Sequence, residues 1–380
     1  MNYISIVKRF ARKTKNQLDN MKKTLSLIVV GTSLFLFSCE DHSESHQKNH
    51  DAALYAHHLR LDGQVAEKAK KIFEPISNVP VENPENPITE EKVKLGKMLY
   101  FDKRLSKDGN ISCNSCHNLA TAGVDNLPTS PGDDGGLGER NSPTVLNAAH
   151  HFLQFWDGRN KDVEEQAGGP ILNPVEMAIP SKEFLIDRLN GVDMYKDMFA
   201  SAYPESSSPI TYLNVQKAIA AFERTLVTPS RFDDYLKGEL QALTLAEKRG
   251  LKTFMDAGCI TCHNGKMLGG NSFQKFGQFK EYWHYTGSEH VDFGRFAVTG
   301  NEADKFMFKV PSLRNIHETG PYFHDGSVED LAEAVNIMAE INLRERLSDE
   351  EVESILTFLG SLSGDIPEET KHAPKELAAL

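Results

Sequence analysis

The chain has 380 residues, of which 39% are hydrophobic and 25% are charged. This composition is ordinary for a globular protein and excludes a largely disordered chain, and the length is sufficient for two domains with hydrophobic cores of their own. The formal net charge of −12 argues against a nucleic-acid-binding protein and is better suited to a cationic protein partner.

The N-terminal region has the pattern of a bacterial export signal. Met21-Lys22-Lys23 precedes the apolar run Leu25–Phe37, which is shorter than the about 20 residues that a helix needs to cross a bilayer. The run ends in Leu36-Phe37-Ser38-Cys39, which resembles a lipobox, and we expect Cys39 to carry lipid after cleavage. A plain signal peptide is the alternative. Residues 1–39 are therefore predicted to be an N-terminal extension and a lipoprotein-type signal peptide, and not a membrane span.

Residues 40–75 are predicted to be a polar tether. The stretch from Glu40 to Asp51 has no apolar residue and contains His42, His46 and His50. Such a composition is typical of a solvated linker between a membrane and a folded body. Metal binding by these histidines is the alternative.

The first half of the folded body, residues 76–228, has a helix at each end and a cysteine motif between them. A helical pattern opens at Thr89-Glu90-Glu91 and leads to Cys113-Asn114-Ser115-Cys116-His117. The half closes with an amphipathic helix that carries Val215, Ile219, Phe222 and Leu226 on its apolar face.

The second half, residues 229–380, repeats this order after a junction near Thr228. A capping box, Thr244-Leu245-Ala246-Glu247, opens a helix before the motif Cys259-Ile260-Thr261-Cys262-His263. A second capping box, from Ser348 to Glu351, opens the closing amphipathic helix. We expect the tail after Asp365 to cross back over the first half.

The two C-x-x-C-H motifs predict two covalently attached haems. The chain has only five Cys and 14 His, so two chance occurrences of this pattern are very improbable. Residues i, i+3 and i+4 share one face of a helix, so two thiols can reach the vinyl groups of one haem while the histidine reaches its iron. The predicted haem-binding residues are Cys113, Cys116, His117, Cys259, Cys262 and His263.

Other uses of four cysteines are less compatible with this pattern. One zinc site with four thiolates does not account for the histidine that follows each pair, and a disulfide framework suits smaller secreted chains. A thioredoxin-like redox pair accounts for neither the second copy nor the histidines. The sequence therefore predicts a mainly α protein with two tandem cytochrome-c-type domains and one covalent haem each.

Several segments strongly resemble the bacterial dihaem cytochrome c peroxidases, in the family's order and spacing, over about residues 75–365. These segments are Arg140–Asn147, Phe155–Arg159, Glu165–Ala167, Gly169–Met177, Lys309–Asn315 and Thr319–Gly326.

The resemblance implies different roles for the two haems. The first, at His117, is the peroxidatic haem, and Glu176 falls on the family's acid/base carboxylate. Gln166 falls on a hydrogen-bonding position of the same pocket, and Trp156 on the aromatic residue between the haems. Cleavage of the O–O bond needs a proton moved from one oxygen to the other, which a carboxylate within reach can do.

The resemblance also assigns the distal ligand of the second haem to Met338. Ligation by His and Met closes a haem to substrate and raises its potential, which suits electron transfer. Met255, Met267 and Met307 lie nearer to the second motif in sequence, so the choice of Met338 depends on the resemblance.

A calcium ion between the domains is a further implication of the resemblance. Asn141, through its side chain, and Thr319 and Pro321, through their carbonyl groups, match the family's protein ligands. Waters would complete the about 6 to 8 ligands that calcium takes. His324 matches a family histidine near the domain interface, and a hydrogen-bonded core histidine is its alternative role.

The chain departs from many family members in the loop after the first motif. Where those members have a histidine that ligates the peroxidatic iron in the oxidised enzyme, this chain has Asp133, in a glycine-rich loop that we expect to be mobile. Either the first haem is open from the start, or His150, His151 or a carboxylate takes that place.

The predicted function is reduction of hydrogen peroxide to water in the periplasm, by a lipid-anchored enzyme. Electrons from a small cytochrome c or cupredoxin would enter at the second haem and pass by way of Trp156. A tryptophylquinone-forming dihaem enzyme, which would have Tyr where this chain has Met338, and a non-catalytic dihaem electron carrier are the alternatives. The oligomeric state is left open, with a homodimer as one option.

Overall fold

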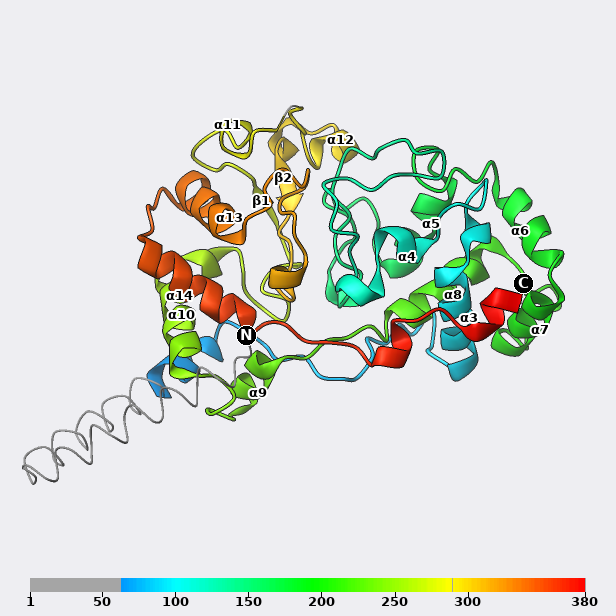
Figure 1. Ribbon diagram of the computed structural model, residues 1–380, viewed down its shortest axis with the longest axis horizontal. Coiled ribbons are helices and arrows are strands. Elements are labelled where there is room, and N and C mark those ends of the chain that lie inside the picture. Colours follow the sequence, from blue (N-terminus) through cyan, green and yellow to red (C-terminus); the bar gives the residue numbers. More distant parts are fainter. Residues whose placement is uncertain (1–62, 289, 380) are drawn as a thin grey trace, which may run out of the picture. The chain divides into compact units, whose positions relative to one another are not determined.

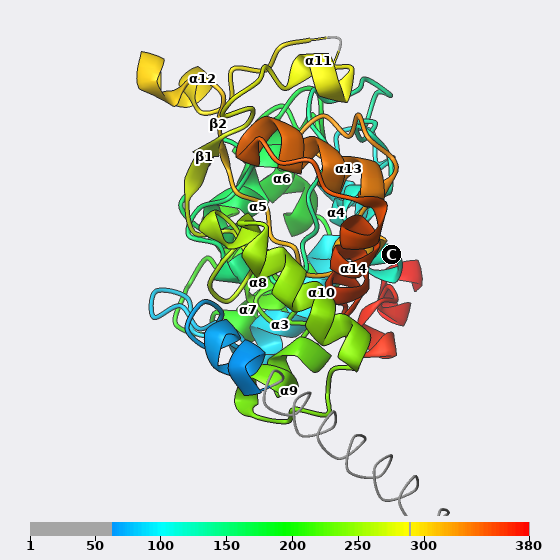
Figure 2. The same cartoon turned by 90° about the vertical axis from the view of Figure 1, so that its left-hand side faces the viewer.

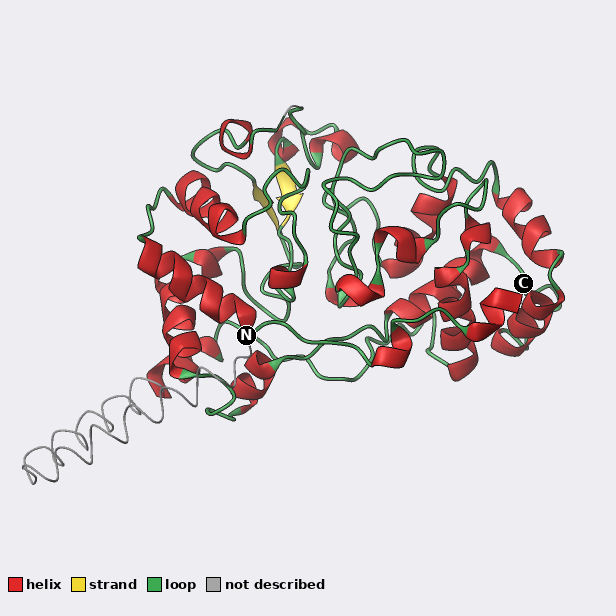
Figure 3. Ribbon diagram, in the orientation of Figure 1, coloured by secondary structure: helices red, strands yellow, loops and turns green. Residues whose placement is uncertain are grey.

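The computed structural model describes residues 63–288 and 290–379. The predicted signal peptide, Cys39 and most of the predicted tether therefore lie outside the described residues. The described chain is mainly helical, with one two-stranded antiparallel sheet, as Figure 3 shows. None of its helices is both long and apolar enough to cross a membrane. The α-helices and strands are α3 (Glu90–Phe101), α4 (Cys113–Cys116), α5 (Val163–Leu172), α6 (Lys182–Asn190), α7 (Asp193–Ala202), α8 (Tyr212–Glu223), α9 (Arg231–Lys237), α10 (Leu245–Asp256), β1 (Phe273–Lys275), α11 (Trp283–Thr286), α12 (Phe296–Thr299), β2 (Met307–Lys309), α13 (Leu331–Met338) and α14 (Asp349–Gly360).

The first half is built around a core formed by α3, α6, α7 and α8 (Figure 1). Helices α3 and α8 pack closely because Gly96 leaves room for the backbone of α8. A Cβ at Gly96 would lie 1.9 Å from the carbonyl oxygen of Ala218. This first core contains Leu95, Leu99, Leu185, Phe199, Val215 and Phe222, among others.

The second half repeats this arrangement with α10 and α14, which lie side by side in Figure 2. A Cβ at Gly250 would lie 2.0 Å from the carbonyl oxygen of Ser354, so a glycine again permits close helix packing. Both predicted capping boxes are present, with Thr244 and Glu247 at the start of α10 and Ser348 and Glu351 at the start of α14. The opening and closing helices of each half therefore form a structural repeat.

The segment before the first half packs into the second core. Residues 63–69 are helical, and Ala66, Ala69 and Phe73 are buried against α9 and α10 residues. The backbone N–H of Ile76 donates to the carboxylate of Asp233 at 2.7 Å. Residues 63–75, expected to be part of a solvated tether, thus belong to the folded body, because their apolar side chains recur at helical spacing.

The C-terminal tail packs against the first core, as expected for a segment that crosses back. Ile366 is buried among first-core residues, and Leu377 packs on the same core. Lys97 on α3 also donates to the carbonyl oxygen of Glu369. In Figure 1 this tail is the red segment that runs from α14 to the side of α3.

Candidate functional site

The first cysteine motif lies on a single helical turn at the wall of a large cavity. Cys113 and Cys116 are the ends of α4, and Ser112 and Ser115 form its capping box. Both thiols and His117 line a cavity of about 650 Å³. The backbone carbonyl of His117 accepts a hydrogen bond from the hydroxyl group of Tyr100. The ring nitrogen Nδ1 of His117 is buried without a partner within the described chain.

The second motif lines a separate and more apolar cavity of about 240 Å³. A 3₁₀ turn, Cys259–Thr261, is followed by Cys262 and His263. The Nδ1 atom of His263 lies 2.8 Å from the carbonyl oxygen of Leu268, which fixes the ring and leaves Nε2 for a metal. Burial lowers the pKa of His117 and of His263, so both rings are held in the neutral form that binds iron.

The four thiols do not form a shared metal or redox site. They lie in two cavities, and no cluster of three or more His, Cys, Asp or Glu residues able to hold a metal occurs in the described chain. Burial raises the pKa of each thiol, which argues against a thiolate nucleophile. Each cavity instead offers two thiols and a neutral imidazole, the donor set that attaches one c-type haem.

Met338 lies at the wall of the second cavity, unlike the other candidate methionines, which do not line it. It is the last residue of α13, directly before the π-helical turn Ala339–Leu343. Met255 and Met267 are buried elsewhere, and Met338 alone among the methionines of the described chain lines this cavity. Short π-helical turns are often found at functional sites.

Glu176 and Gln166 line the same cavity as His117. Gln166 is on α5, and Glu176 is in the loop that follows this helix. Burial raises the pKa of Glu176, although the charge of Arg159 and a hydrogen bond with Asn173 oppose the shift. The structure thus brings together a protonatable carboxyl group, an amide and the haem-attachment motif, which the sequence alone could not place in space.

Asp133 does not line the first cavity, and it braces the loop that carries Glu176. Its side chain is only 4% exposed, and its carboxylate accepts hydrogen bonds from the backbone N–H groups of Asp108, at 2.6 Å, and Asn110, at 3.0 Å. Burial alone would raise the pKa of Asp133, but these hydrogen bonds outweigh it and the pKa lies below the ordinary value. The backbone N–H of Asp133 donates to the carbonyl oxygen of Glu176 at 2.7 Å.

The loop of Asp133 is therefore held by hydrogen bonds and is not the mobile loop that its glycines predict, and its carboxylate, one of the alternative ligands left open for the first haem, is already engaged. Both carboxylate oxygens of Asp133 are engaged by backbone donors. Gly132 is packed so closely that a Cβ there would lie 1.9 Å from the carbonyl oxygen of Val175. Gly132 in this loop therefore permits close contact with the loop of Glu176.

Six residues line both cavities and so form a wall that the two cavities share: Asn141, Pro143, Thr144, His151, Trp156 and Lys309. Trp156 is fixed in this wall because its indole N–H donates to the carbonyl oxygen of Asn141 at 2.9 Å. Its position between the cavities is the one that an aromatic residue between two haems would need.

The residues expected to bind calcium lie together at the second cavity. Asn141, Thr319 and Pro321 all line it. The amide nitrogen of Asn141 donates to the carbonyl oxygen of Leu127 at 3.0 Å, which leaves its side-chain oxygen available. His324 lines this cavity too, and its backbone carbonyl accepts a hydrogen bond from the N–H of Asn141.

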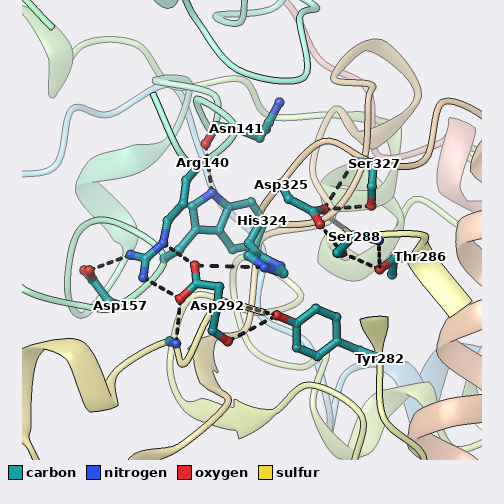
Figure 4. Close-up of polar contacts among 12 residues, drawn as sticks. Arg140, Asn141, Asp157, Tyr282, Thr286, Ser288, Asp292, His324, Asp325 and Ser327 are labelled. Atoms are coloured by element: carbon teal, nitrogen blue, oxygen red, sulfur yellow. Dashed lines mark hydrogen bonds and ion pairs between the residues drawn. The ribbon is translucent and has the colours of Figure 1, made fainter. Parts of the chain in front are cut away.

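A salt-bridge network joins the two halves beside this wall (Figure 4). Arg140, from the first half, is bonded to Asp292, from the second half, through Nε at 2.6 Å and Nη2 at 3.0 Å. The same guanidinium group is bonded to Asp157 at 2.5 Å. The buried ring of His324 lies nearby, with its Nε2 atom 3.9 Å from the carboxylate of Asp292. This bidentate pair sets how the two halves meet next to Trp156.

His150 and His151 are not equivalent, although they are adjacent. The ring of His151 packs against Gly270, where a Cβ would lie 2.5 Å from it, and Nδ1 of His151 lies 2.9 Å from Nζ of Lys309. The Nε2 atom of His150 is buried without a partner in the described chain, and burial lowers the pKa of His150 to about 4. His150 does not line the first cavity.

Sequence reasoning missed two groups at the site. Arg159 lines the first cavity and covers the ring of Phe155 at 3.4 Å, and its charge acts on Glu176. Its only sequence signal was its place in a recognised segment. The pairing of His151 with Lys309 was missed because the two residues are far apart in the chain, although His151 was an alternative ligand and Lys309 opens a recognised segment.

Comparisons with known proteins agree with this geometry. The model of the di-haem cytochrome c peroxidase family matches residues 90–241. The chain is 46% identical to a cytochrome c551 peroxidase of Pseudomonas aeruginosa over 302 residues, which cover 79% of this chain and 87% of that protein. It is 47% identical to a cytochrome c551 peroxidase of Nitrosomonas europaea over 296 residues, which cover 78% of this chain and 86% of that protein.

Among solved structures, the fold resembles a MauG-like protein associated with microbial copper homeostasis. The TM-score is 0.66 at 30% sequence identity, and the match covers 78% of this chain and 95% of that one. Both attachment motifs and the cavities they line are those of a protein with two c-type haems. The chain belongs to the dihaem cytochrome c peroxidase family.

Proposed function

We propose that this chain is a cytochrome c peroxidase that reduces hydrogen peroxide to water with electrons from a small cytochrome c or cupredoxin. The observation that carries the proposal is the common cavity of His117, Gln166 and Glu176, with Trp156 in the wall that it shares with the second cavity. The relatives named cytochrome c551 peroxidase are 46% and 47% identical to the chain, against 30% for the MauG-like structure.

The half at residues 76–228 would hold the peroxidatic haem through Cys113, Cys116 and His117. The half at 229–380 would hold the electron-transfer haem through Cys259, Cys262, His263 and Met338. When bound, the haems supply redox-active iron that takes electrons singly from the donor and passes both to peroxide. Trp156 would lie on the route between them, since it lines both cavities.

The residues of the first cavity would perform the proton transfers. The overall reaction consumes one peroxide, two electrons and two protons and yields two waters. Glu176, as a carboxylate, would accept the proton of the nearer peroxide oxygen and return it to the leaving oxygen, so that water and not hydroxide departs. Gln166 would orient the peroxide by hydrogen bonding and has no titratable proton of its own to exchange.

Calcium at Asn141, Thr319 and Pro321 is part of the proposal. An amide oxygen and two backbone carbonyl oxygens are neutral hard ligands of the kind that calcium accepts, with water completing its coordination. All three residues line the second cavity, and the Asn141 carbonyl also holds Trp156. Calcium would therefore act by positioning the shared wall.

The export signal and Cys39 support a periplasmic lipoprotein anchored to a membrane through its lipid. Both lie outside the described residues, and mass spectrometry of the exported protein would test them. A homodimer is the oligomeric state that the family resemblance admits, and light scattering of the holoprotein would test it.

Two alternative functions have less support. A tryptophylquinone-forming enzyme is disfavoured because position 338, at the wall of the second cavity, holds Met and not the Tyr that such an enzyme would have there. A non-catalytic electron carrier would have no use for Glu176 and Gln166 in the first cavity. Steady-state oxidation of a reduced cytochrome c by peroxide tests the proposal, and absence of turnover in the protein with both haems attached would contradict it.

A further inference from the structure

The wall shared by the two cavities contains a buried lysine. Lys309, the last residue of β2, is 5% exposed, and together with His151 it lines both cavities. Its backbone N–H donates to the carbonyl oxygen of Trp156 at 2.7 Å. Lys309 is therefore fixed directly beside the residue proposed to lie on the electron route.

The side chain of Lys309 has an unusual partner for a buried cation. Its Nζ atom lies 2.9 Å from Nδ1 of His151, and within the described residues no carboxylate forms an ion pair with it. An ammonium group can only donate, so Nδ1 of His151 must then accept and the imidazole proton must be on Nε2. That Nε2 atom is buried and has no partner in the described chain.

The surrounding charges leave Lys309 only weakly neutralised. Asp157 favours the charged lysine, but its carboxylate is already bonded to Arg140 and Arg159. Arg295 donates to the backbone carbonyl of Asp157 at 3.0 Å and adds further positive charge.

The remaining charged neighbours do not compensate either. His150 precedes His151, and positive charge from Lys266 and Arg314 acts on it. On β1, which pairs with β2, the charged residue is Lys275, which is exposed.

These surroundings make the proton of Lys309 exchangeable near neutral pH. Burial lowers the pKa of Lys309 to about 7, with the charge of Asp157 opposing the shift. Burial and the neighbouring Lys309 lower the pKa of His151 as well. A lysine at this pKa can change its charge in response to a nearby electron, because a one-unit negative change beside it favours the ammonium form.

We propose that Lys309, supported by His151, is a redox-linked proton-binding site that serves both haem pockets. One electron from the cytochrome donor converts one ferric haem to the ferrous form, and one proton from solvent converts the Lys309 amine to an ammonium group. When the electron is spent on peroxide, the proton is released toward the first cavity, so that each of the two electrons consumed is accompanied by one of the two protons. The destination of the electrons rests on the proposed peroxidase function, whereas the proton binding does not.

The test is the pH dependence of the haem midpoint potentials, measured by spectroelectrochemistry on the holoprotein without peroxide. Protonated Lys309 stabilises the reduced haem, so at least one midpoint potential should fall as the pH rises through about 7. If one proton is bound with each electron, the equilibrium constant for reduction changes at most tenfold per pH unit. The midpoint potential of a one-electron couple then changes by at most 59 mV per pH unit. Midpoint potentials that do not change across about pH 6 to 8 would overturn the proposal.

Two variants separate Lys309 from other titrating groups, including the haem propionates. Lys309→Met should abolish the pH dependence and hold the potential at its alkaline limit, whereas Lys309→Arg should abolish it and hold the potential at its acid limit. Lys252→Met, at an exposed lysine on α10 that lines neither cavity, should keep the wild-type pH dependence. Haem content from the absorption spectrum shows whether each variant has folded.

The outcomes distinguish this proposal from the proposed function. If Lys309→Met keeps the full pH dependence, another group binds the proton and the proposal is wrong. If the wild-type dependence is present and Lys309-dependent but peroxide is not reduced, the proton-binding site stands and the peroxidase function fails.

Discussion

The backbone N–H of Asp133 donates a 2.7 Å hydrogen bond to the carbonyl oxygen of Glu176. Two loops far apart in the sequence are thereby joined at the first cavity, and the buried carboxylate of Asp133 holds one of them in turn against Asp108 and Asn110. Asp133, which the family resemblance aligns with a histidine ligand of other members, is thus part of the hydrogen-bonded support for the proposed acid/base group.

Replacement of Asp133 by Ala should slow peroxide reduction without loss of haem. Two backbone N–H groups, those of Asp108 and Asn110, would lose their partly buried acceptor, at about 1 kcal/mol each, and the loop would shift. Displacement of a catalytic group by about 1 Å can cost about 100-fold in rate, so we expect kcat/KM for peroxide to fall about 10- to 100-fold. Asp134→Ala, at an exposed neighbour in the same loop, should leave the rate unchanged. Equal loss in both variants would contradict the bracing role.

The oxidised protein should bind cyanide at the first haem without prior reduction. Asp133 cannot ligate the iron while backbone donors hold its carboxylate, and His151 is held by Lys309. We therefore expect a high-spin component in the electron paramagnetic resonance spectrum of the fully oxidised protein and a shift of its Soret band with cyanide. A fully low-spin spectrum that resists cyanide until half-reduction would refute this expectation and point to His150 or to movement of His151.

Glu176→Gln should lower peroxide turnover by about 10²–10⁴-fold, because the amide keeps the shape of the side chain but transfers no proton. The acid limb of the wild-type rate profile should lie above the ordinary Glu pKa of about 4.3, since burial raises the pKa of Glu176 and only the deprotonated form accepts a proton. Arg159 opposes that shift, so Arg159→Met should move the limb to higher pH. Stopped-flow rates across the pH range would show both effects, and a wild-type rate in Glu176→Gln would exclude the acid/base role.

Met338→His should lower the midpoint potential of the second haem while both haems remain attached. Thioether ligation raises the potential of a haem relative to imidazole ligation. We expect a fall on the order of 100 mV, within the about 0.8 V range that axial ligands cover. Met307→Leu changes a methionine that does not line the second cavity and should leave the potential unchanged. The reverse pattern, measured by redox titration, would make Met307 the ligand.

Arg140→Met should destabilise the contact between the two halves by about 3 kcal/mol, because it leaves the partly buried carboxylate of Asp292 without its ion pair and Asp157 with Arg159 alone. Arg159→Met removes a more exposed pair to Asp157 and should cost about 0–1 kcal/mol. Chemical denaturation measures both changes.

The contribution of this pair should also depend on pH. Burial raises the pKa of Asp292, but pairing with Arg140 outweighs it and the pKa lies below its ordinary value. The stabilisation is therefore fully present above about pH 4 and is lost as the pH falls through the lowered pKa. We therefore expect wild type to lose more stability at acid pH than Arg140→Met. The opposite result, an unchanged wild type and a destabilised variant, would contradict the assignment.

Local sequence signals were sufficient for the parts of the fold that depend on neighbouring residues. The capping boxes at Thr244 and Ser348 are confirmed, because such a cap is a contact between residues three apart. The helical patterns after Thr89 and around Val215 are confirmed as α3 and α8. Nothing in the sequence near Gly96 or Gly250 indicated that each glycine would contact the backbone of a helix about 100 residues away.

Contacts between distant residues were beyond the sequence. Lys309 and His151 are separated by 158 positions, and neither carries a motif that names the other. Asp133 was misjudged for the same reason: glycines around it suggested mobility, whereas the close approach to Val175 that they permit is visible only once both loops are placed. The burial of Phe73 in the second core likewise depends on residues that follow it by more than a hundred positions.

The exchange of terminal segments between the halves has a consequence for biosynthesis. Phe73 is made before the first half but completes the second core, and Ile366 is made after the second half but completes the first. Neither half is a continuous stretch of chain, so neither can finish folding while the ribosome still holds the last residues. This protein therefore cannot follow the usual order, in which an N-terminal domain folds while the next domain is still being made. The first core can therefore be completed only once the chain is present as far as Ile366, after the whole of the second half.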